Sequence, residues 1–281
     1  MIPYSISESL KNKFFQWLWV GKSAIPYRPQ YVIKKVLSPV LFIISQEVGV
    51  EDCGLRMQLF WRSLACRFIY RYFIQFINKY YYYSYAWVGS WAGTRVLKAP
   101  TDLFVYQEIL SENRPDVIIE CGTANGGTAL FLAHICDALG NGRIVTIDIN
   151  PEPHPEVEPG IFRPYHDRIL YMIGDTLSED VLNILRNNIK KDESVMVILD
   201  SEHTKYQVKN ELELYSRFVT PGQYLIVEDT NVGHSVEIKR KKDGPMDALR
   251  EWLDVHPEFR IDYEREKHML TFNSCGYLRR M

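Results

Sequence analysis

The feature that most constrains this chain is a series of five short apolar runs between residues 116 and 229, each ending in an acidic residue. Helical patterns separate the runs, among them TALFLAHICDAL, SEDVLNILRNNI and YQVKNELELYSRFV. Runs that are apolar almost throughout are typical of parallel strands covered on both faces. The alternation therefore predicts an α/β fold with a doubly wound parallel sheet. The predicted strands are DVIIE (116–120), RIVTID (143–148), ILYMIGD (169–175), VMVILD (195–200) and YLIVED (224–229).

The last part of the chain indicates that one edge of this parallel sheet is formed by antiparallel strands. A further helix, MDALREWLDV, follows Pro245, and two more strands are expected in FRIDYERE and HMLTFNS. The two segments lie close together in the sequence, as the strands of an antiparallel pair often do. We therefore expect an antiparallel C-terminal hairpin at one edge of the sheet.

The first part of the chain has another character: 1–98 are expected to form a helical, aromatic and basic extension, and 99–281 the α/β domain. No Pro or Gly interrupts the run that begins at Met57, and Arg56, Arg67 and Arg71 fall on one side at helical spacing. The wide apolar face of this helix favours packing on the α/β domain or on another subunit of a homo-oligomer. Peripheral contact with a membrane surface and a lid over a hydrophobic substrate are the alternatives.

Composition argues against several classes of protein. The formal net charge of −2 over 281 residues gives no support for nucleic-acid binding. The five cysteines form no CxxC pair, and Cys121 and Cys136 fall in expected core, which favours a reducing compartment over a disulfide framework. No signal-peptide pattern and no apolar run of membrane-spanning length is found, so we expect a soluble, cytoplasmic protein.

The stretch VIIECGTANGGTALF (117–131) joins the first strand of the predicted sheet to a helix through a glycine-rich turn. A strand, such a turn and a helix N-terminus together form a nucleotide site. Glu120 precedes the glycines, and a carboxylate there would repel the pyrophosphate of a dinucleotide. It suits S-adenosylmethionine, which carries a sulfonium and an ammonium. The residues assigned to this donor site are Glu120, Gly122, Thr123, Gly126, Gly127, Thr128, Asp148 and Asp175.

Two of these residues lie at the ends of the next strands. Asp148 ends the second strand, where an acid accepts both ribose hydroxyls of a nucleotide. Asp175 follows the third strand, at a place where it would accept from an adenine amino group. The combination favours a methyl donor, and a nicotinamide cofactor is the alternative.

Acids also end the last two parallel strands. In a doubly wound sheet these strands are neighbours beyond the switch point, so Asp200, Glu228 and Asp229 are expected in one crevice. Carboxylates this close repel one another unless they take up protons or a cation joins them, and oxygen ligands favour Mg²⁺ or Ca²⁺ over zinc. The other interpretation is that they are unrelated, exposed strand ends.

His203 lies three residues beyond Asp200 and is the candidate general base, because histidine accepts protons near neutral pH. A divalent ion beside a hydroxyl favours loss of its proton, so the pattern indicates methyl transfer to an alcohol. His166 and His234 lie in two long loops, 150–168 and 230–244, and receive no role.

With these residues identified, the sequence resembles the cephalosporin hydroxylase and rhamnosyl O-methyltransferase family, and the related metal-dependent macrolide-sugar O-methyltransferases. The resemblance covers about residues 86–281. The stretches that carry it include KAPTDLFVYQEIL, RPDVIIECGTANGGTALF, VMVILDSEHTKYQVKNEL, YLIVEDTNVGHSVEI and TFNSCGYLRR.

The resemblance implies a Rossmann-like class I methyltransferase sheet, Mg²⁺ ligands at Asp200, Glu228 and Asp229, the base His203, and homo-oligomers in which N-terminal segments take part. The expected activity is Mg²⁺-dependent O-methylation of a hydroxyl on a sugar, polyketide or nonribosomal-peptide product. A donor-binding accessory protein to a partner oxygenase and a nicotinamide-dependent oxidoreductase are the alternatives. The acceptor is not carried over, because the loop that borders its site contains the basic run 239–242.

Overall fold

The computed structural model describes residues 89–152, 163–231, 243–268 and 270–281, together with Asn78, Tyr80, Tyr81 and Ser84. Those four single residues are helical. Apart from these four residues, the basic aromatic helix expected from Met57 lies outside the described residues. So do most of the rest of the extension 1–98, His234 and the basic run 239–242. In the described part of the chain, no helix is both long enough and apolar enough to cross a membrane.

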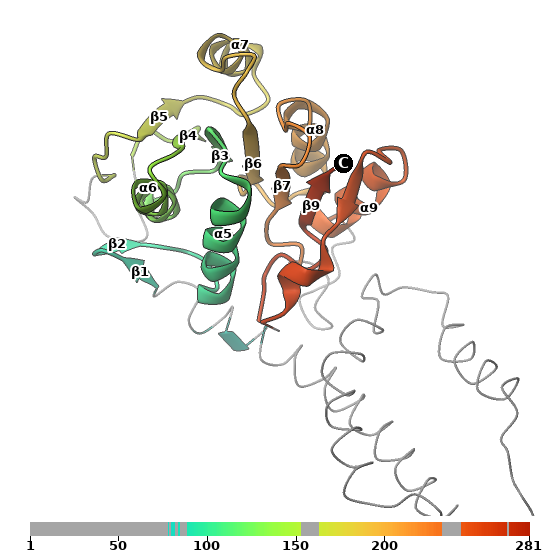
Figure 1. Ribbon diagram of the computed structural model, residues 1–281. Helices are drawn as coiled ribbons and strands as arrows, with labels where there is room; N and C mark the ends of the chain where they lie inside the picture. The colour runs from blue at the N-terminus through green and yellow to red at the C-terminus, as the bar shows by residue number, and fades with distance from the viewer. Residues whose placement is uncertain are drawn as a thin grey trace, which may run out of the picture.

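The described residues form a seven-stranded sheet in the order β5-β4-β3-β6-β7-β9-β8 (Figure 1). The five strands from β5 to β7 are parallel, and β9 runs antiparallel to both β7 and β8. The strands are β3 (Val117–Cys121), β4 (Arg143–Asp148), β5 (Ile169–Ile173), β6 (Val195–Leu199), β7 (Tyr224–Val227), β8 (Phe259–Ile261) and β9 (Tyr277–Arg280). The chain runs outward from β3 to β5 and then returns to β6 beside β3, so the predicted doubly wound sheet with an antiparallel edge is confirmed.

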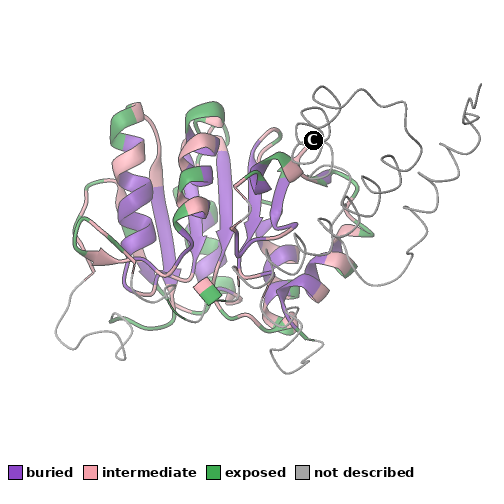
Figure 2. Cartoon of the chain, turned by 90° about the horizontal axis from the view of Figure 1, so that it is seen from below, coloured by how far each residue is buried: buried purple, intermediate pink, exposed green. Residues whose placement is uncertain are grey.

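Helices cover both faces of this sheet, because successive strand residues point to opposite sides. One face, with Ile119 and Val197, packs against α7, α8 and α9, and the other, with Ile118 and Ile198, packs against α5 and α6. Figure 2 shows the strands as a buried layer between helices that are exposed on their outer sides. The helices are α5 (Pro100–Asn113), α6 (Gly127–Leu139), α7 (Glu179–Asn188), α8 (Lys205–Tyr215) and α9 (Pro245–Leu253).

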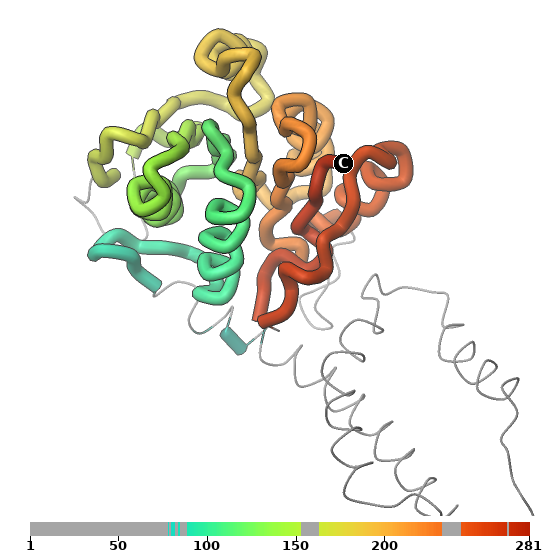
Figure 3. The backbone as a smooth tube through the Cα atoms, viewed as in Figure 1, coloured from blue at the N-terminus to red at the C-terminus, as the bar shows by residue number. Residues whose placement is uncertain are grey.

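Helix α5 was not among the predicted helices, and neither was the small hairpin that precedes it. The hairpin consists of β1 (Ser90–Trp91) and β2 (Thr94–Arg95) and lies beside α6 in the backbone trace of Figure 3. Trp91 packs edge-on against Phe131 of α6, with ring centroids 4.9 Å apart, and its Nε1 donates to His134 Nδ1 at 2.9 Å. Residues from Gly89 onward are therefore built onto the sheet domain.

The second strand of the C-terminal pair was predicted in the wrong place. HMLTFNS was expected to be a strand, but β9 lies beyond it, at Tyr277–Arg280. The backbone of 271–275 is bonded to side chains instead of to a neighbouring strand: Phe272 N–H donates to Asp102 Oδ2 at 2.9 Å, and Cys275 N–H donates to Glu266 Oε1 at 2.7 Å. Cys275, directly after HMLTFNS, has a φ of 59°, which no regular strand contains and which separates this segment from β9.

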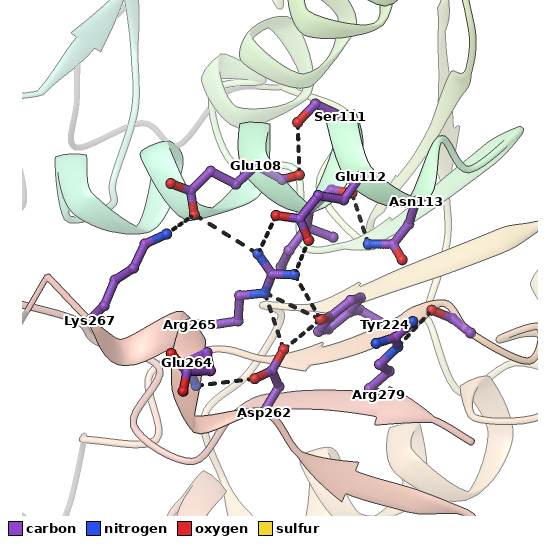
Figure 4. Close-up of polar contacts among 12 residues, drawn as sticks. Glu108, Ser111, Glu112, Asn113, Tyr224, Asp262, Glu264, Arg265, Lys267 and Arg279 are labelled. Atoms are coloured by element: carbon purple, nitrogen blue, oxygen red, sulfur yellow. Dashed lines mark hydrogen bonds and ion pairs between the residues drawn. The ribbon is translucent and has the colours of Figure 1, made fainter. Parts of the chain in front are cut away.

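Arg265 fixes the C-terminal segment against α5 (Figure 4). It lies in a short 3₁₀ turn, Tyr263–Glu266, and its guanidinium pairs with Glu112 of α5 and with Asp262. The same group donates to the hydroxyl of Tyr224 on β7 at 3.0 Å. This planar fork therefore joins a helix, a strand and the turn that leads toward β9.

Candidate active site

The site lies where the carboxyl ends of β3, β6 and β7 meet, since these strands are neighbours in the sheet. The ladder continues one residue past each of the last two strands. Asp200 N–H donates to Cys121 C=O at 2.8 Å, and Glu228 N–H donates to Leu199 C=O at 3.0 Å. The backbones of Asp200 and Glu228, two of the three predicted metal ligands, are thus fixed by the sheet itself.

The glycine turn approaches other backbone segments closely. Gly122 has a φ of +97°, and a Cβ at this position would lie 1.9 Å from the carbonyl oxygen of Asp200. A Cβ at Gly127 would lie 2.0 Å from the carbonyl oxygen of Arg95. Gly126, with a φ of +79°, is the N-cap of α6. These glycines therefore let the turn touch both the end of β6 and the strand β2.

Asp148 holds the turn in place. Its Oδ2 accepts from the backbone N–H groups of Thr123 and Ala124 at 3.1 and 2.9 Å, and its Oδ1 accepts from Asn150 N–H. Arg163 lies 3.2 Å from Oδ2. The ribose-binding role expected for Asp148 stays a prediction, and in this structure its oxygens bind the turn that the donor would meet.

Glu120 lies beneath the turn and is only 1% exposed. Thr146 Oγ1 donates to its Oε2 at 2.6 Å, and the hydroxyls of Thr146 and Thr123 are 2.7 Å apart. Burial raises the pKa of Glu120 to about 7, against the opposing effect of the Lys98 ammonium.

Two further turn residues bear on a donor. Thr128 is buried in the first turn of α6. Asn125 is 2% exposed, and its Oδ1 has no hydrogen-bond partner among the described residues. A buried acceptor without a partner is costly, and it fits a ligand that brings N–H donors, as the amino group of S-adenosylmethionine would. Asn125 was not singled out from the sequence, because the pattern of the turn drew attention to its glycines.

Asp175 is exposed beyond the end of β5, and its Oδ1 accepts from Leu177 N–H at 2.9 Å. The neighbouring Thr176 donates to Glu211 Oε1 at 2.6 Å, and Ser201 donates to the same oxygen at 2.5 Å. Glu211 of α8 thus joins the end of β5 to the residue after Asp200, on the predicted metal side. This link has no signal in the sequence, because Glu211 is a single Glu in an amphipathic helix.

The acid cluster contains a cation from outside the strands. Lys98 Nζ donates to Asp200 Oδ2 at 2.6 Å and also to Glu228 Oε2. Tyr106 of α5 donates to the other oxygen of Glu228 at 2.6 Å. Burial alone would lower the pKa of Lys98, but the carboxylates of Asp200 and Glu228 outweigh burial and raise it. Lys98 lies 102 and 130 residues from these partners in the sequence, so no local spacing indicated the contact.

Asp229 and His203 complete the cluster on its more exposed side. His203 Nε2 lies 3.3 Å from Asp229 Oδ2, and the donor atoms of Asp200, His203 and Asp229 all lie within 4.8 Å of one another. Asp229 has a φ of 51°, an uncommon conformation that recurs at functional sites. Burial raises the pKa of Asp229 to about 6, although His203 acts in the opposite direction.

This donor set fits a divalent ion. Two ligands of one Mg²⁺ ion, each about 2.1 Å from it, lie no more than about 4.2 Å apart. The donor atoms of Asp200, His203 and Asp229, which lie within 4.8 Å of one another, would therefore have to close by at most about 0.6 Å around an ion. The carboxylates of Asp200 and Asp229 suit a hard cation, and the imidazole of His203 adds either a ligand or a base. Glu228 is more deeply buried, but each of its oxygens keeps a further lone pair beside its bond to Lys98 or Tyr106. Its assignment as a ligand stays a prediction.

His166 lies away from this cluster. It precedes β5 at the amino end of the strand, and its Nε2 lies 3.0 Å from Asp137 Oδ2 at the end of α6. The candidate site is at the carboxyl ends of the strands, on the opposite edge of the sheet. His166 therefore pairs with a helix residue far from the proposed chemistry.

The chain was compared with known proteins. The family model for rhamnosyl O-methyltransferase/CmcI matches residues 80–281. A rhamnosyl O-methyltransferase of Mycobacterium leprae is 33% identical over 208 residues, which cover 72% of this chain and 87% of the relative. One from Mycobacterium tuberculosis is 31% identical over 194 residues, which cover 67% of this chain and 77% of the relative.

Solved structures agree on the fold. CmcI with Mg and SAM matches with a TM-score of 0.51 and 20% identity, over 69% of this chain and 76% of that chain. Apo CmcI matches with a TM-score of 0.50 and 21% identity, over the same shares of the two chains. The predicted Rossmann-like class I methyltransferase fold is confirmed. With the family match over 80–281 and relatives above 30% identity that cover most of both chains, the chain belongs to the rhamnosyl O-methyltransferase/CmcI family and is an S-adenosylmethionine-dependent O-methyltransferase.

Proposed function

We propose that this enzyme is Mg²⁺-dependent and methylates a hydroxyl of a sugar, or of a polyketide or nonribosomal-peptide product. The observation that supports it best is the convergence of Asp200, His203 and Asp229, whose donor atoms lie within 4.8 Å of one another at the carboxyl ends of adjacent strands. A sugar is the first candidate, because the mycobacterial relatives are rhamnosyl O-methyltransferases.

The donor site is formed by the glycine turn and the acids around it. Asn125 Oδ1 and the carboxyl of Glu120 would receive the amino group of the donor, which carries the N–H groups that a buried acceptor needs. Asp148 would receive the ribose hydroxyls at the outer side of the turn, and Asp175, which is exposed, would receive the adenine amino group. Gly122 and Gly127 let the turn lie directly against the backbones of Asp200 and Arg95, which fixes the position of this donor site.

The metal residues lie on the neighbouring strands. Asp200 and Asp229 would hold Mg²⁺, with Glu228 as a third ligand. When bound, Mg²⁺ supplies positive charge that favours loss of the proton from an acceptor hydroxyl. His203 would take that proton at Nε2, and Asp229, 3.3 Å from this nitrogen, would stabilise the resulting imidazolium. The sheet contributes proximity, because the glycine turn at 122–127, which we call the donor turn, and the acid cluster lie at the same edge of the sheet.

The test uses the full chain, labelled S-adenosylmethionine and a panel of acceptors: a methyl rhamnoside, a rhamnosylated glycolipid, a macrolide glycoside and, as a non-sugar control, a catechol. We expect methyl transfer to a sugar hydroxyl, loss of turnover with a chelator, and recovery with Mg²⁺. Donor binding, measured by calorimetry, should persist without metal. Turnover at the full rate in chelator would refute the metal role.

Two variants separate the roles of the acid and the base. Asp200→Asn should lose Mg²⁺ binding and turnover together. His203→Gln should retain Mg²⁺ binding but lose the rise in rate with pH that a general base produces. Glu202→Gln is the matched control, because Glu202 lies between them in the sequence and its side chain is exposed. Equal losses in all three variants would indicate damage to the loop and not a role in chemistry.

Homo-oligomerisation through 1–98, peripheral membrane contact and a cytoplasmic location stay predictions. Light scattering after gel filtration, on the full chain and on a chain that begins near Trp87, measures whether the extension is needed for self-association. Co-sedimentation of the same two proteins with liposomes measures membrane contact.

A further inference from the structure

Lys98 occupies an unusual place for a lysine. It lies in the short segment between β2 and α5, its side chain is 2% exposed, and its Nζ is bonded to Asp200 and to Glu228. A lysine is almost never buried to this extent without acidic partners. Here the partners are residues from two different strands, at the centre of the proposed metal site.

The backbone around Lys98 is firmly placed, so the ammonium has little freedom. Val96 N–H donates to Gly89 C=O at 2.9 Å, and Arg95 C=O abuts Gly127 of the donor turn so closely that no Cβ fits between them. Ala99 is buried and caps the start of α5. The position of the ammonium is therefore set by a segment that also contacts the donor turn.

The cluster needs compensation for its negative charge. Asp200, Glu228 and Asp229 lie at adjacent strand ends, and Glu120 is close enough for its interaction with Lys98 to affect the pKa of both groups. Carboxylates held this closely repel one another strongly in a buried site. Lys98 neutralises the inner, buried part of the cluster, whereas Asp200, His203 and Asp229 form its outer, partly exposed part.

We propose that Lys98 is a tethered counter-cation of the metal site. It positions the carboxylates of Asp200 and Glu228, and by its like charge it limits the affinity with which the site binds a divalent ion. The ammonium holds the acid cluster together when no metal is bound, so that the ion enters a site already in place. This inference rests on the proposed metal dependence, and it assigns Lys98 a positioning role and no contact with substrate.

The test measures Mn²⁺ binding, by electron paramagnetic resonance and calorimetry, and the shift of the melting temperature that Mn²⁺ produces. Lys98→Met removes the charge at similar length, Lys98→Arg keeps it, and Lys209→Met is the control, because Lys209 is half exposed on α8. We expect Lys98→Met to bind Mn²⁺ about tenfold or more tightly than the wild type, since a like charge a few ångströms away is gone. In chelator, Lys98→Met should have a lower melting temperature than the wild type, and Mn²⁺ should raise this temperature by more than it raises that of the wild type. Lys98→Arg and Lys209→Met should resemble the wild type in all of these measurements.

Lys98→Met can fail to fold. In that case the double variant Lys98→Met/Glu228→Gln is tested for stability in its place, because it removes the ammonium together with one of the charges that the ammonium compensates. The double variant should be more stable in chelator than Lys98→Met, and equal or lower stability would overturn the proposal. Unchanged Mn²⁺ affinity in Lys98→Met, with wild-type binding intact, would overturn this inference and leave the proposed function standing. No Mn²⁺ binding by any of the proteins would overturn both.

Discussion

Gly122 meets two structural demands in the donor turn, a positive φ and close contact with backbone that leaves no room for a Cβ. The variant Gly122→Ala, compared with an alanine at a glycine that meets only the first demand, separates their effects on stability. Gly122 has a φ of +97° and lies against the backbone of Asp200, where a Cβ would be 1.9 Å from the carbonyl oxygen. The matched position is Gly140, which follows α6 with a φ of +66° and where an added Cβ would have nothing within 4 Å. Gly140→Ala therefore meets the conformational cost alone, whereas Gly122→Ala meets a steric clash as well.

The expected magnitudes follow from these distances. An alanine with positive φ costs about 1 kcal/mol, which is the expected loss for Gly140→Ala. In Gly122→Ala the Asp200 carbonyl has to move by about 1 Å, because real Cβ contacts are essentially never below 3.0 Å. We expect the neighbouring 2.8 Å bond from Asp200 N–H to Cys121 C=O to be strained or lost with this shift, at about 1–3 kcal/mol for a buried group. We expect a total loss near 3 kcal/mol. The effect on the unfolded chain is the same for both variants and cancels in the comparison.

Urea unfolding followed by circular dichroism gives both free energies, and calorimetry gives the affinity for S-adenosylmethionine. Gly122→Ala should lose more stability than Gly140→Ala and should bind the donor more weakly, because the turn and the end of β6 move together. Equal stability losses in the two variants would refute the reasoning, since they would mean that the close approach at Gly122 has no energetic consequence.

Two further predictions concern the C-terminal segment. Burial raises the pKa of Glu266 to about 7 from an ordinary 4.5, so its contribution to stability is complete below pH 4.5 and is lost as the pH rises to 7. The loss is about 3 kcal/mol, and Glu266→Gln, which keeps the acceptor for Cys275 N–H, should flatten the pH dependence of urea unfolding between pH 5 and pH 8. Arg265→Met should lower stability by about 2 kcal/mol, because the buried hydroxyl of Tyr224 loses its donor, whereas Arg260→Met at an exposed position should change little in the same assay.

Much of the fold could be predicted because the parallel strands carry their own signal. A strand covered on both faces is apolar at nearly every position, so β3, β4 and β6 could be located within one residue of their observed ends. The second edge strand could not. HMLTFNS looks like a strand by composition, but β9 is the shorter segment Tyr277–Arg280, and the segment before it is held by Asp102 and Glu266 from elsewhere in the chain.

The candidate site divides in the same way. Residues at strand ends could be anticipated, because the order of the strands determines which ends become neighbours: Asp200 and Glu228 follow β6 and β7, which are paired. What these side chains bind could not be anticipated. The sequence pattern assigns Asp148 to a ribose, and in this structure it accepts from the turn. No sequence pattern points to Glu211 or Asn125.

Lys98 weakens one inference from the sequence. Repulsion among Asp200, Glu228 and Asp229 requires protons or a cation, and the sequence pattern alone favours a metal in that place. The structure supplies an ammonium that is bonded to two of the three acids, so repulsion alone no longer calls for Mg²⁺. The case for a metal now rests on the outer side of the cluster, where Asp229 meets His203 and where Asp200 keeps an oxygen that Lys98 does not bind. A divalent ion there would add to the ammonium and need not replace it, which is why the affinity of Lys98→Met for Mn²⁺ is the informative measurement.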